Sequence, residues 1–189
     1  AVPPASSAWG PDDPVPGLLA AGGALDVASL LTAYRGGVFP WFSEGQPILW
    51  WSPDPRAIFE LDDFRVSSRL LRTCRSGHFE VTCNRDFAGV IAGCASAAGR
   101  VANTWLTPKM IEAYTRLHTA GQAHSIEVWR GDELVGGVYG VRIGRFFAGE
   151  SMFHRATDAS KVALVHLVDW MHATDGVLLD VQWTTPHLV

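Results

Sequence analysis

The sequence contains very little lysine: Lys109 and Lys161 are the only two among its 189 residues, and the formal net charge is −4. A protein that binds polyanions in general is basic, so this composition argues against a broad nucleic-acid binder. It still allows a local basic patch. Apolar residues make up 48% of the chain, which is typical of a globular protein rather than a disordered one.

Cysteine is also scarce. Cys74, Cys83 and Cys94 match no zinc spacing, and their odd number argues against a disulfide framework. Reduced thiols in the cytoplasm are the simplest interpretation. The seven histidines contain no H-E-x-x-H pattern, so no metal is expected. No apolar run reaches membrane-spanning length and the first residues lack the features of a signal peptide, so we expect no membrane segment.

The apolar periodicity predicts both helices and strands. Helices are expected in "LDVASLLTAYRGG", "SSRLLRTCRSG", "RDFAGVIAGCASAA", "TPKMIEAYTRLHTAG" and "DASKVALVHLVDWMHATDG", and strands in "RAIFEL", "HFEVTCN", "HSIEVWRG", "ELVGGVYGVRI", "RFFAGESMF" and "VLLDVQW". The three strands before the last helix should form an antiparallel meander, and the last strand, apolar on both faces, should be central. This order predicts an α+β fold with a mixed sheet flanked by helices, of the acetyltransferase (GNAT) type.

We expect a domain boundary near residue 60. Residues 1–60 would form a small N-terminal α/β domain, and residues 61–189 the GNAT-like domain. The first part contains the segment "VFPWFSEGQPILWWSPDPR", in which three tryptophans and two phenylalanines lie among four prolines. Because proline forces extended or turn geometry on the residue before it, this segment cannot be one regular element.

Asp180 and Gln182 interrupt the apolar run of the last predicted strand. Residues two apart on a strand point to the same face, and a buried carboxylate costs free energy unless it is paired or hydrogen-bonded. Two interpretations remain open: the pair meets solvent at the strand end, or it forms the floor of a cleft. Glu150, in an otherwise apolar strand end, is likewise either an exposed edge residue or a carboxylate that faces a cationic or amine-bearing ligand.

Two further patterns concern anions and cofactors. Arg65, Arg69, Arg72 and Arg75 recur at helical spacing without interleaved acids, so they form either a solvated surface or a phosphate site. The stretch "GGVYG" lacks the Q/R-x-x-G-x-G/A order that cradles a pyrophosphate in acetyl-coenzyme A enzymes. The usual cofactor loop of a GNAT fold is therefore not expected.

Long motifs extend across roughly residues 18 to 188. In chain order they are "FPWFSEGQPILWWSPDPRAI", "TWLTPKMIEAYTRLHTAGQAHSIEVW", "ELVGGVYGV", "FAGESMF", "ASKVALVHLV" and "LLDVQ". Together they resemble the leucyl/phenylalanyl-tRNA–protein transferase family. Motifs of this length and tryptophan content are highly specific.

The resemblance implies a cytoplasmic enzyme of N-end rule degradation that moves Leu, Phe or Met from aminoacyl-tRNA to a protein with an N-terminal Arg or Lys. Because the aminoacyl ester is already activated, no nucleotide, metal or coenzyme is needed. The alternatives are another GNAT-like acyltransferase, such as a coenzyme A-dependent enzyme or a cell-wall aminoacyl-tRNA transferase, and a non-catalytic module that binds tRNA or an N-degron.

The resemblance also implies the donor site. The residues expected around the terminal adenosine and the aminoacyl side chain are Trp50, Trp51, Trp105, Val138, Phe147 and Met152. Adenine stacks on aromatic faces, and Met and aromatic surfaces adapt to several apolar side chains. Trp41 and Phe42 are expected to be ordinary core residues.

The family's D-x-Q pair falls on Asp180 and Gln182. In the aminolysis of an ester, the acceptor amine loses a proton and the carbonyl oxygen gains negative charge. Because a neutral amide is a poor base, Gln182 is expected to position the ester or stabilise the oxyanion. Asp180 would orient Gln182 and attract the acceptor amine. Glu150 would hold the cationic acceptor end or the amino group of the donor.

Two expectations concern the rest of the molecule. Arg69, Arg72 and Arg75 would contact phosphates of the tRNA acceptor stem without reading its sequence. The family normally continues beyond "HLV", so we expect the C-terminal end of the GNAT-like domain to be truncated in this sequence, which would leave the sheet and part of the cleft incomplete.

Overall fold

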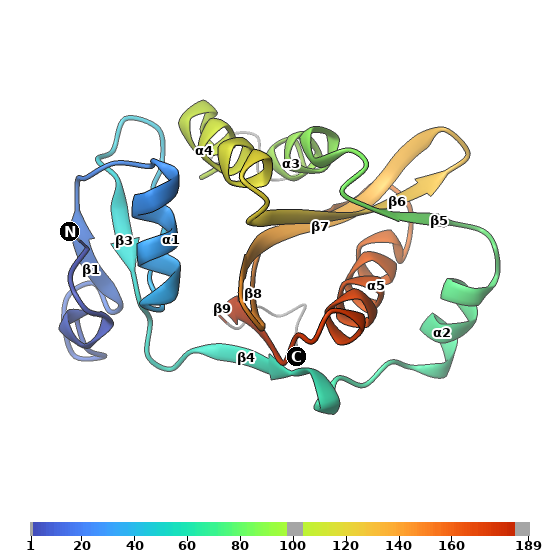
Figure 1. Cartoon of the computed structure of the whole chain (residues 1–189), viewed down its shortest axis with the longest axis horizontal. Helices are drawn as coiled ribbons and strands as arrows, with labels where there is room; N and C mark the ends of the chain where they lie inside the picture. Colours follow the sequence, from blue (N-terminus) through green and yellow to red (C-terminus); the bar gives the residue numbers. More distant parts are fainter. Residues whose placement is uncertain (1, 98–103, 184–189) are drawn as a thin grey trace.

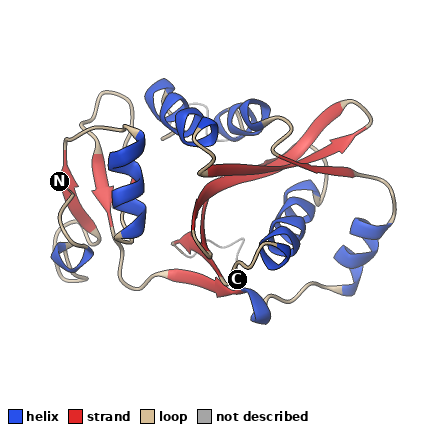
Figure 2. Cartoon of the chain, in the orientation of Figure 1, coloured by secondary structure: helices blue, strands red, loops and turns tan. Residues whose placement is uncertain are grey.

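A computed structural model of the chain describes residues 2–97 and 104–183. The described residues form two separate sheets joined by one extended segment (Figures 1 and 2). The smaller sheet is antiparallel, has the strand order β1-β3-β2 and is built from β1 (Leu18–Ala21), β2 (Phe39–Pro40) and β3 (Leu49–Trp51). Short 3-10 helices, η1 (Ala5–Ser7) and η2 (Leu61–Asp63), lie before β1 and after β4.

Helix α1 (Val27–Arg35) lies beside the small sheet. Asp26 caps its first turn, because the carboxylate accepts a hydrogen bond from the backbone N–H of Ser29 at 2.9 Å. The helix ends at the glycine pair that the sequence contains there, and Gly37 has a φ of +75°, which only glycine adopts without strain. The predicted helix in this stretch is confirmed.

The larger sheet has the strand order β4-β9-β8-β7-β6-β5. Its strands are β4 (Ala57–Glu60), β5 (Glu80–Cys83), β6 (Ala123–Arg130), β7 (Glu133–Ile143), β8 (Phe146–His154) and β9 (Leu178–Gln182). Strands β5 to β8 are antiparallel neighbours, and β9 pairs parallel with β8 and antiparallel with β4. The predicted mixed sheet and the meander are confirmed. The last strand, β9, has a neighbour on each side, but it lies next to the edge strand β4 and not in the middle of the sheet.

Helices cover both faces of this sheet (Figure 1). They are α3 (Phe87–Ala95), α4 (Pro108–Thr119) and α5 (Ala159–Ala173), whereas α2 (Ser68–Arg75) packs against α5. Helices α3 and α4 pack on one face and share their core with the small sheet and α1, whereas α5 packs on the other face. Among the described residues, no helix has both the length and the apolar character needed to cross a bilayer.

The domain boundary that the sequence predicts near residue 60 lies at the end of strand β4. This strand belongs to the larger sheet, because Ala57 pairs with Gln182 and Glu60 with Leu178 at its edge. The small sheet and α1, which we call the small unit, therefore lie before Ala57. A local pattern cannot reveal this, because β4 and β9 are far apart in the sequence.

Strands β8 and β9 separate soon after they begin to pair. Their parallel register covers only Phe146↔Leu178, Phe147↔Leu179 and Ala148↔Asp180. A register irregularity between Tyr139 and Gly140 interrupts the pairing of β7 with β8 at the same level. The sheet is thus opened between β8 and β9, with residues 149–150 on one side of the opening and 181–183 on the other.

The glycines that pair across β7 and β8 at this level, Gly140 and Gly149, differ in the space around them. A Cβ at Gly140 would overlap the carbonyl oxygen of Ala148 and the ring of Phe147, whereas a Cβ at Gly149 would lie 3.5 Å from the carbonyl oxygen of Asp180. We predict that Gly140→Ala lowers the free energy of unfolding by about 1–3 kcal/mol, and that the matched control Gly149→Ala changes it by less than about 1 kcal/mol. Urea unfolding checks this, and equal effects of the two changes would contradict it.

Candidate active site

A cavity of about 440 Å³ lies where the small unit meets the opening between β8 and β9. The residues that line it are Pro16, Pro40, Trp41, Trp51, Trp105, Gly149, Glu150, Val181, Gln182 and Trp183. Five of these ten residues are proline or tryptophan outside the larger sheet, and four of the five lie within the first 51 residues. The other five lie in β8, in β9 or directly after β9.

Three tryptophans form an edge-to-face cluster on one side of the cavity. The ring centroid of Trp41 lies 5.6 Å from those of Trp51 and Trp183, and Trp51 and Trp183 are 6.1 Å apart. The indole N–H of Trp51 donates to the carbonyl oxygen of Trp41 at 2.7 Å, which fixes its ring. Such a cluster presents flat apolar faces on which a planar ring can stack.

The predicted aromatic residues separate into two groups. Trp51 and Trp105 line the cavity, but Trp50 does not, because it points to the other face of β3 and donates from its indole N–H to the carbonyl oxygen of Gly22. The expectation that Trp41 is a core residue is wrong: it is 42% exposed and lines the cavity. The same expectation for Phe42 is confirmed, since its side chain is buried.

The predicted side-chain pocket lies on the other face of the larger sheet. Val138 and Phe147 are buried and Met152 is partly buried in the core cluster that includes α5. None of these three residues lines the cavity. The sheet separates them from the cavity, and only Phe147 lies in the short stretch of β8 that pairs with β9.

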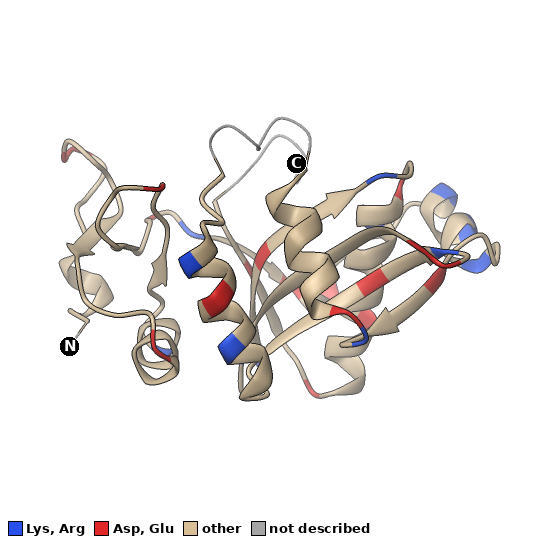
Figure 3. Ribbon diagram, turned by 90° about the horizontal axis from the view of Figure 1, so that it is seen from above, with Lys and Arg blue, Asp and Glu red and all other residues tan. Residues whose placement is uncertain are grey.

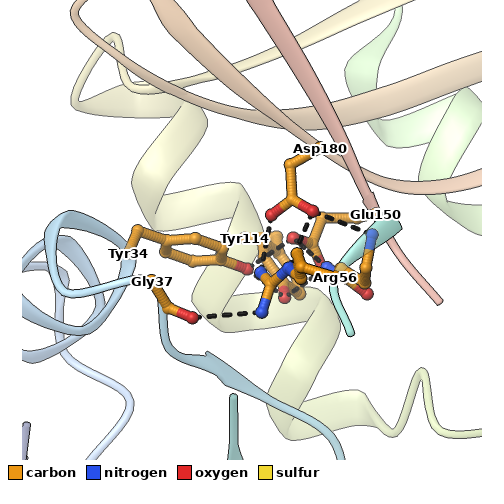
Figure 4. Close-up of polar contacts among 7 residues, drawn as sticks. Tyr34, Gly37, Arg56, Tyr114, Glu150 and Asp180 are labelled. Carbon is orange, nitrogen blue, oxygen red and sulfur yellow. Dashed lines mark hydrogen bonds and ion pairs between the residues drawn. The ribbon is translucent and has the colours of Figure 1, made fainter. Parts of the chain in front are cut away.

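Glu150 lies on the floor of the cavity among hydroxyl and amide groups from three other elements (Figure 4). Its two carboxyl oxygens lie 2.7 Å from the hydroxyl oxygen of Tyr34 on α1 and 2.8 Å from that of Tyr114 on α4. The side-chain amide of Gln182 donates to the same carboxyl group at 3.1 Å. The structure therefore brings together Glu150 and Gln182, which the sequence analysis had named separately.

The environment of Glu150 changes its acidity. Loss of hydration raises the pKa of this carboxyl group to about 7, and the nearby Asp180 carboxylate acts in the same direction, against the opposing effect of the hydrogen bonds. Burial and the proximity of Glu150 raise the pKa values of Tyr34 and Tyr114 well above the usual range of a phenol. Both hydroxyl groups consequently keep their protons.

Asp180 does not line the cavity but lies behind it, fully buried and paired with Arg56. The guanidinium group of Arg56 donates two parallel hydrogen bonds to the Asp180 carboxylate, at 2.8 and 2.6 Å. Arg56 also donates to the carbonyl oxygen of Gly37 at 3.1 Å and lies over the ring of Phe39. Bidentate arginine–carboxylate pairs of this kind fix orientation as well as charge.

Asp180 also determines the conformation of Gln182. Its carboxylate accepts a hydrogen bond from the backbone N–H of Gln182 at 2.9 Å, and the N–H of Trp183 donates to the carbonyl oxygen of Val181 at 2.8 Å. Together these bonds close a tight turn in which Gln182 has a φ of +65°, an uncommon value for a residue other than glycine. The turn ends β9 and directs the Gln182 amide to Glu150.

Four residues of this site were not predicted from the sequence. Tyr34 and Tyr114 occur at buried positions of amphipathic helices, where a tyrosine usually indicates core. Arg56 was quoted only as part of the proline-rich segment, and Trp183 only as the end of the last strand. A buried carboxylate needs a partner, and this rule predicted that Asp180 would have one but not which residue it would be.

The predicted phosphate-binding arginines lie far from the cavity. Arg69, Arg72 and Arg75 are exposed on α2, and Arg69 pairs with Asp158 at 3.4 Å. Helix α2 packs against α5 at the end of the molecule opposite the small unit, where basic positions gather (Figures 1 and 3). Among the described residues, no cluster of three His, Cys, Asp or Glu side chains could hold a metal ion.

The lining of the cavity combines two kinds of surface. Indole faces suit a flat ring, while Glu150 and Gln182 present a carboxyl group and an amide donor to a polar reacting centre. These features fit an enzyme of the group-transfer class. Sequence comparisons specify the family.

The profile described as "Leucyl/phenylalanyl-tRNA protein transferase" matches residues 58–189, and the profile of its N-terminal domain matches residues 23–54. The chain belongs to this family, and its activity class is that of the aminoacyltransferases. A relative from Solidesulfovibrio magneticus with the same description is 59% identical over 92% of this chain and 70% of its own length. A second, from Chromohalobacter salexigens, is 54% identical over 91% of this chain and 67% of its own length.

Among solved structures, that of L-PGS from Bacillus licheniformis aligns with a TM-score of 0.46 and 13% identity over 87% of this chain and 55% of that chain. At this level the similarity says nothing about activity.

We predict that the Arg56–Asp180 pair contributes strongly to stability. Asp180→Ala leaves a guanidinium group largely buried without its partner, so the free energy of unfolding should fall by about 3–5 kcal/mol. Arg56→Ala should cost a similar amount, and the double variant should cost clearly less than the sum of the two.

The matched control is Glu112→Ala, which breaks the exposed ion pair of Glu112 with Arg116 on α4 and should cost less than about 1 kcal/mol. Urea unfolding of the four variants measures all of these values. Strict additivity of the Arg56 and Asp180 changes would show that the pair is not coupled.

Proposed function

We propose that this protein transfers Leu, Phe or Met from aminoacyl-tRNA to the N-terminal Arg or Lys of acceptor proteins, as a cytoplasmic enzyme of N-end rule degradation. The single observation that carries the proposal is the meeting of indole faces and a polar floor in one cavity. The donor combines a terminal adenosine with an activated ester. Its two ends thus need these two kinds of surface at the same place.

The tryptophan cluster suits the adenosine end of the donor. Stacking of one base on aromatic side chains contributes about 1–3 kcal/mol. Trp51 and Trp105 are the retained candidates for this contact, and Trp41 and Trp183, which also line the cavity, join them. Trp50 would act indirectly, because it holds β3 through its bond to Gly22.

The donor side chain requires an apolar pocket. We retain Val138, Phe147 and Met152 for this role, which requires the side chain to pass between β8 and β9 toward α5. Such a pocket discriminates by shape at about 1–3 kcal/mol per methylene, which fits a mixed preference for Leu, Phe and Met. Access through the sheet opening is also the reason that we assign the larger domain to the GNAT-like folds.

We explain the roles of Gln182 and Asp180 by the way in which they hold the reacting groups in place. Gln182 would donate its amide N–H to the carbonyl oxygen as negative charge develops there. Asp180, bound to Arg56, would hold the turn that directs Gln182, and this role replaces direct contact of Asp180 with the acceptor amine. Much of the acceleration would come from holding two reactants in register.

A transfer assay tests the function against its rivals. The protein is incubated with Phe-tRNA and a peptide that begins with Arg, without any coenzyme, and the peptide mass is followed. We predict a mass increase of one Phe residue, and none for an otherwise identical peptide that begins with Glu. Transfer that requires coenzyme A would support another acyltransferase. Binding of tRNA or peptide without transfer would support a binding module.

The arginines of helix α2 lead to a separate prediction. Replacing Arg69, Arg72 and Arg75 together by Ala should weaken tRNA binding and reduce the magnitude of the slope of log affinity against log salt by about 2–3, since about one counterion is released per contact. Turnover at saturating tRNA should stay unchanged. Arg130→Ala, which removes an exposed arginine on β6, is the control and should leave the slope near its wild-type value. An unchanged slope in the triple variant would refute the phosphate site.

A further inference from the structure

The oxygen atoms around Glu150 make more short contacts than two hydroxyl protons can fill. The hydroxyl oxygens of Tyr34 and Tyr114 lie 2.8 Å apart, and each also lies within 2.8 Å of a Glu150 carboxyl oxygen. Each hydroxyl group supplies one proton, so two protons serve three contacts. With an ionised Glu150, one contact would bring two oxygen lone pairs together without a proton between them.

A proton on Glu150 removes this deficit. The carboxyl O–H then donates to one tyrosine, that tyrosine donates to the other, and the second tyrosine donates to the remaining carboxyl oxygen. Gln182 still donates its amide N–H to the carboxyl group. Every oxygen in this ring of hydrogen bonds among Glu150, Tyr34 and Tyr114 then has a proton to donate or accept. This matters because an unpaired polar group in a buried site costs free energy.

The charged groups around this hydrogen-bond ring also favour a protonated Glu150. The groups that face Glu150 are Tyr34 from α1, Tyr114 from α4 and Asp180 from β9. Tyr139 of β7 lies edge-on to Tyr114, and Arg56 is already engaged by Asp180. No described cation is paired with Glu150, and the pKa of about 7 agrees with a carboxyl group that is protonated near neutral pH.

We propose that Glu150 holds a proton in the resting protein and passes it to the ribose oxygen that leaves when the donor ester is cleaved. This role rests on the proposed aminoacyl transfer. Glu150 is the only ionisable side chain among the described residues that line the cavity, so a proton that the protein supplies there comes from this carboxyl group. Its neutral state also suits it to donate rather than to bind a cation.

The proton balance of the step closes on Glu150. The neutral amine of the acceptor attacks the ester carbonyl carbon, a C–N bond forms and the bond from carbon to the ribose oxygen breaks. The ribose oxygen takes the proton of Glu150 and leaves as a hydroxyl group. The nitrogen, now bonded to the carbonyl carbon, gives its excess proton to the Glu150 carboxylate. The ring of Tyr34, Tyr114 and Glu150 is then restored for the next turnover.

The kinetic test compares wild type with Glu150→Gln over pH 5.5 to 9. Glutamine keeps the size and a hydrogen-bond donor but cannot release a proton, so kcat at pH 6 should fall about 100-fold or more while KM for the donor stays close to that of wild type. We divide kcat of wild type by kcat of Glu150→Gln at each pH. This ratio does not depend on the ionisation of the acceptor amine, because that ionisation affects both proteins equally. We expect this ratio to decrease as pH rises through about 7, because wild type loses its neutral carboxyl group there.

A ratio that increases through the same range would mean that the carboxylate is the active form, and it would overturn the proposal. So would a large rise in KM with little change in kcat, which indicates binding of a cation. Glu112→Gln, an exposed change on α4, is the control, and its kcat should equal that of wild type at every pH.

A second measurement needs no turnover. The infrared carboxyl band that is lost in Glu150→Gln reports the ionisation of Glu150 in the protein without substrates, and we expect this band to persist to pH 6.5. Its absence at pH 5.5 would overturn the resting protonation. If the band is present but wild type transfers no aminoacyl group in the assay above, the proposed function and the delivery step fail together, while the protonated ring stands as a structural feature.

Discussion

The ion pair between Arg56 and Asp180 is the constraint on which the arrangement of this protein depends. Arg56 lies in the extended segment that joins the two sheets, and its guanidinium group contacts Asp180 of β9, the carbonyl oxygen of Gly37 and the ring of Phe39. One side chain therefore connects the small unit to the larger sheet. Because a buried charge without its partner is strongly unfavourable, the pair fixes the position at which the two units meet.

The cavity lies at this junction, and its chemistry follows from the mixture of surfaces there. Apolar indole rings exclude water from one side, while the sheet opening places Glu150 and Gln182 at the floor. Burial of Glu150 raises the pKa of its carboxyl group, and a low local dielectric strengthens its contacts with Tyr34 and Tyr114. The aromatic segment thus supplies one wall of the same cavity that Glu150 lines.

Much of the secondary structure could be predicted from local patterns. Thr107 and Pro108 indicate the start of α4, and in the structure the Thr107 side chain accepts the backbone N–H of Met110 as a helix cap does. Alternating apolar residues predicted the meander of β6, β7 and β8. The position of Asp180 and Gln182 in the last strand also indicated a polar couple, since both residues lie two apart on an otherwise apolar element.

The partners of these groups could not be predicted in the same way. Tyr34 and Tyr114 are far apart in the sequence and each follows the apolar face of its helix, so only packing of α1 against α4 reveals that their hydroxyl groups converge. Trp41 and Trp50 look alike in the sequence, yet one is exposed in the cavity and the other is buried, because the turns between prolines decide which face each ring takes.

The sequence by itself determined the elements, the family resemblance and the residue types available for chemistry, because helix caps, strand alternation and glycine turns act over a few residues. Only the tertiary structure decided which of those residues share one cavity, which carboxylate is paired with an arginine and which carboxyl group has a raised pKa. Those properties depend on distances between distant segments and on the loss of water between them, and neither quantity exists until the two units pack together.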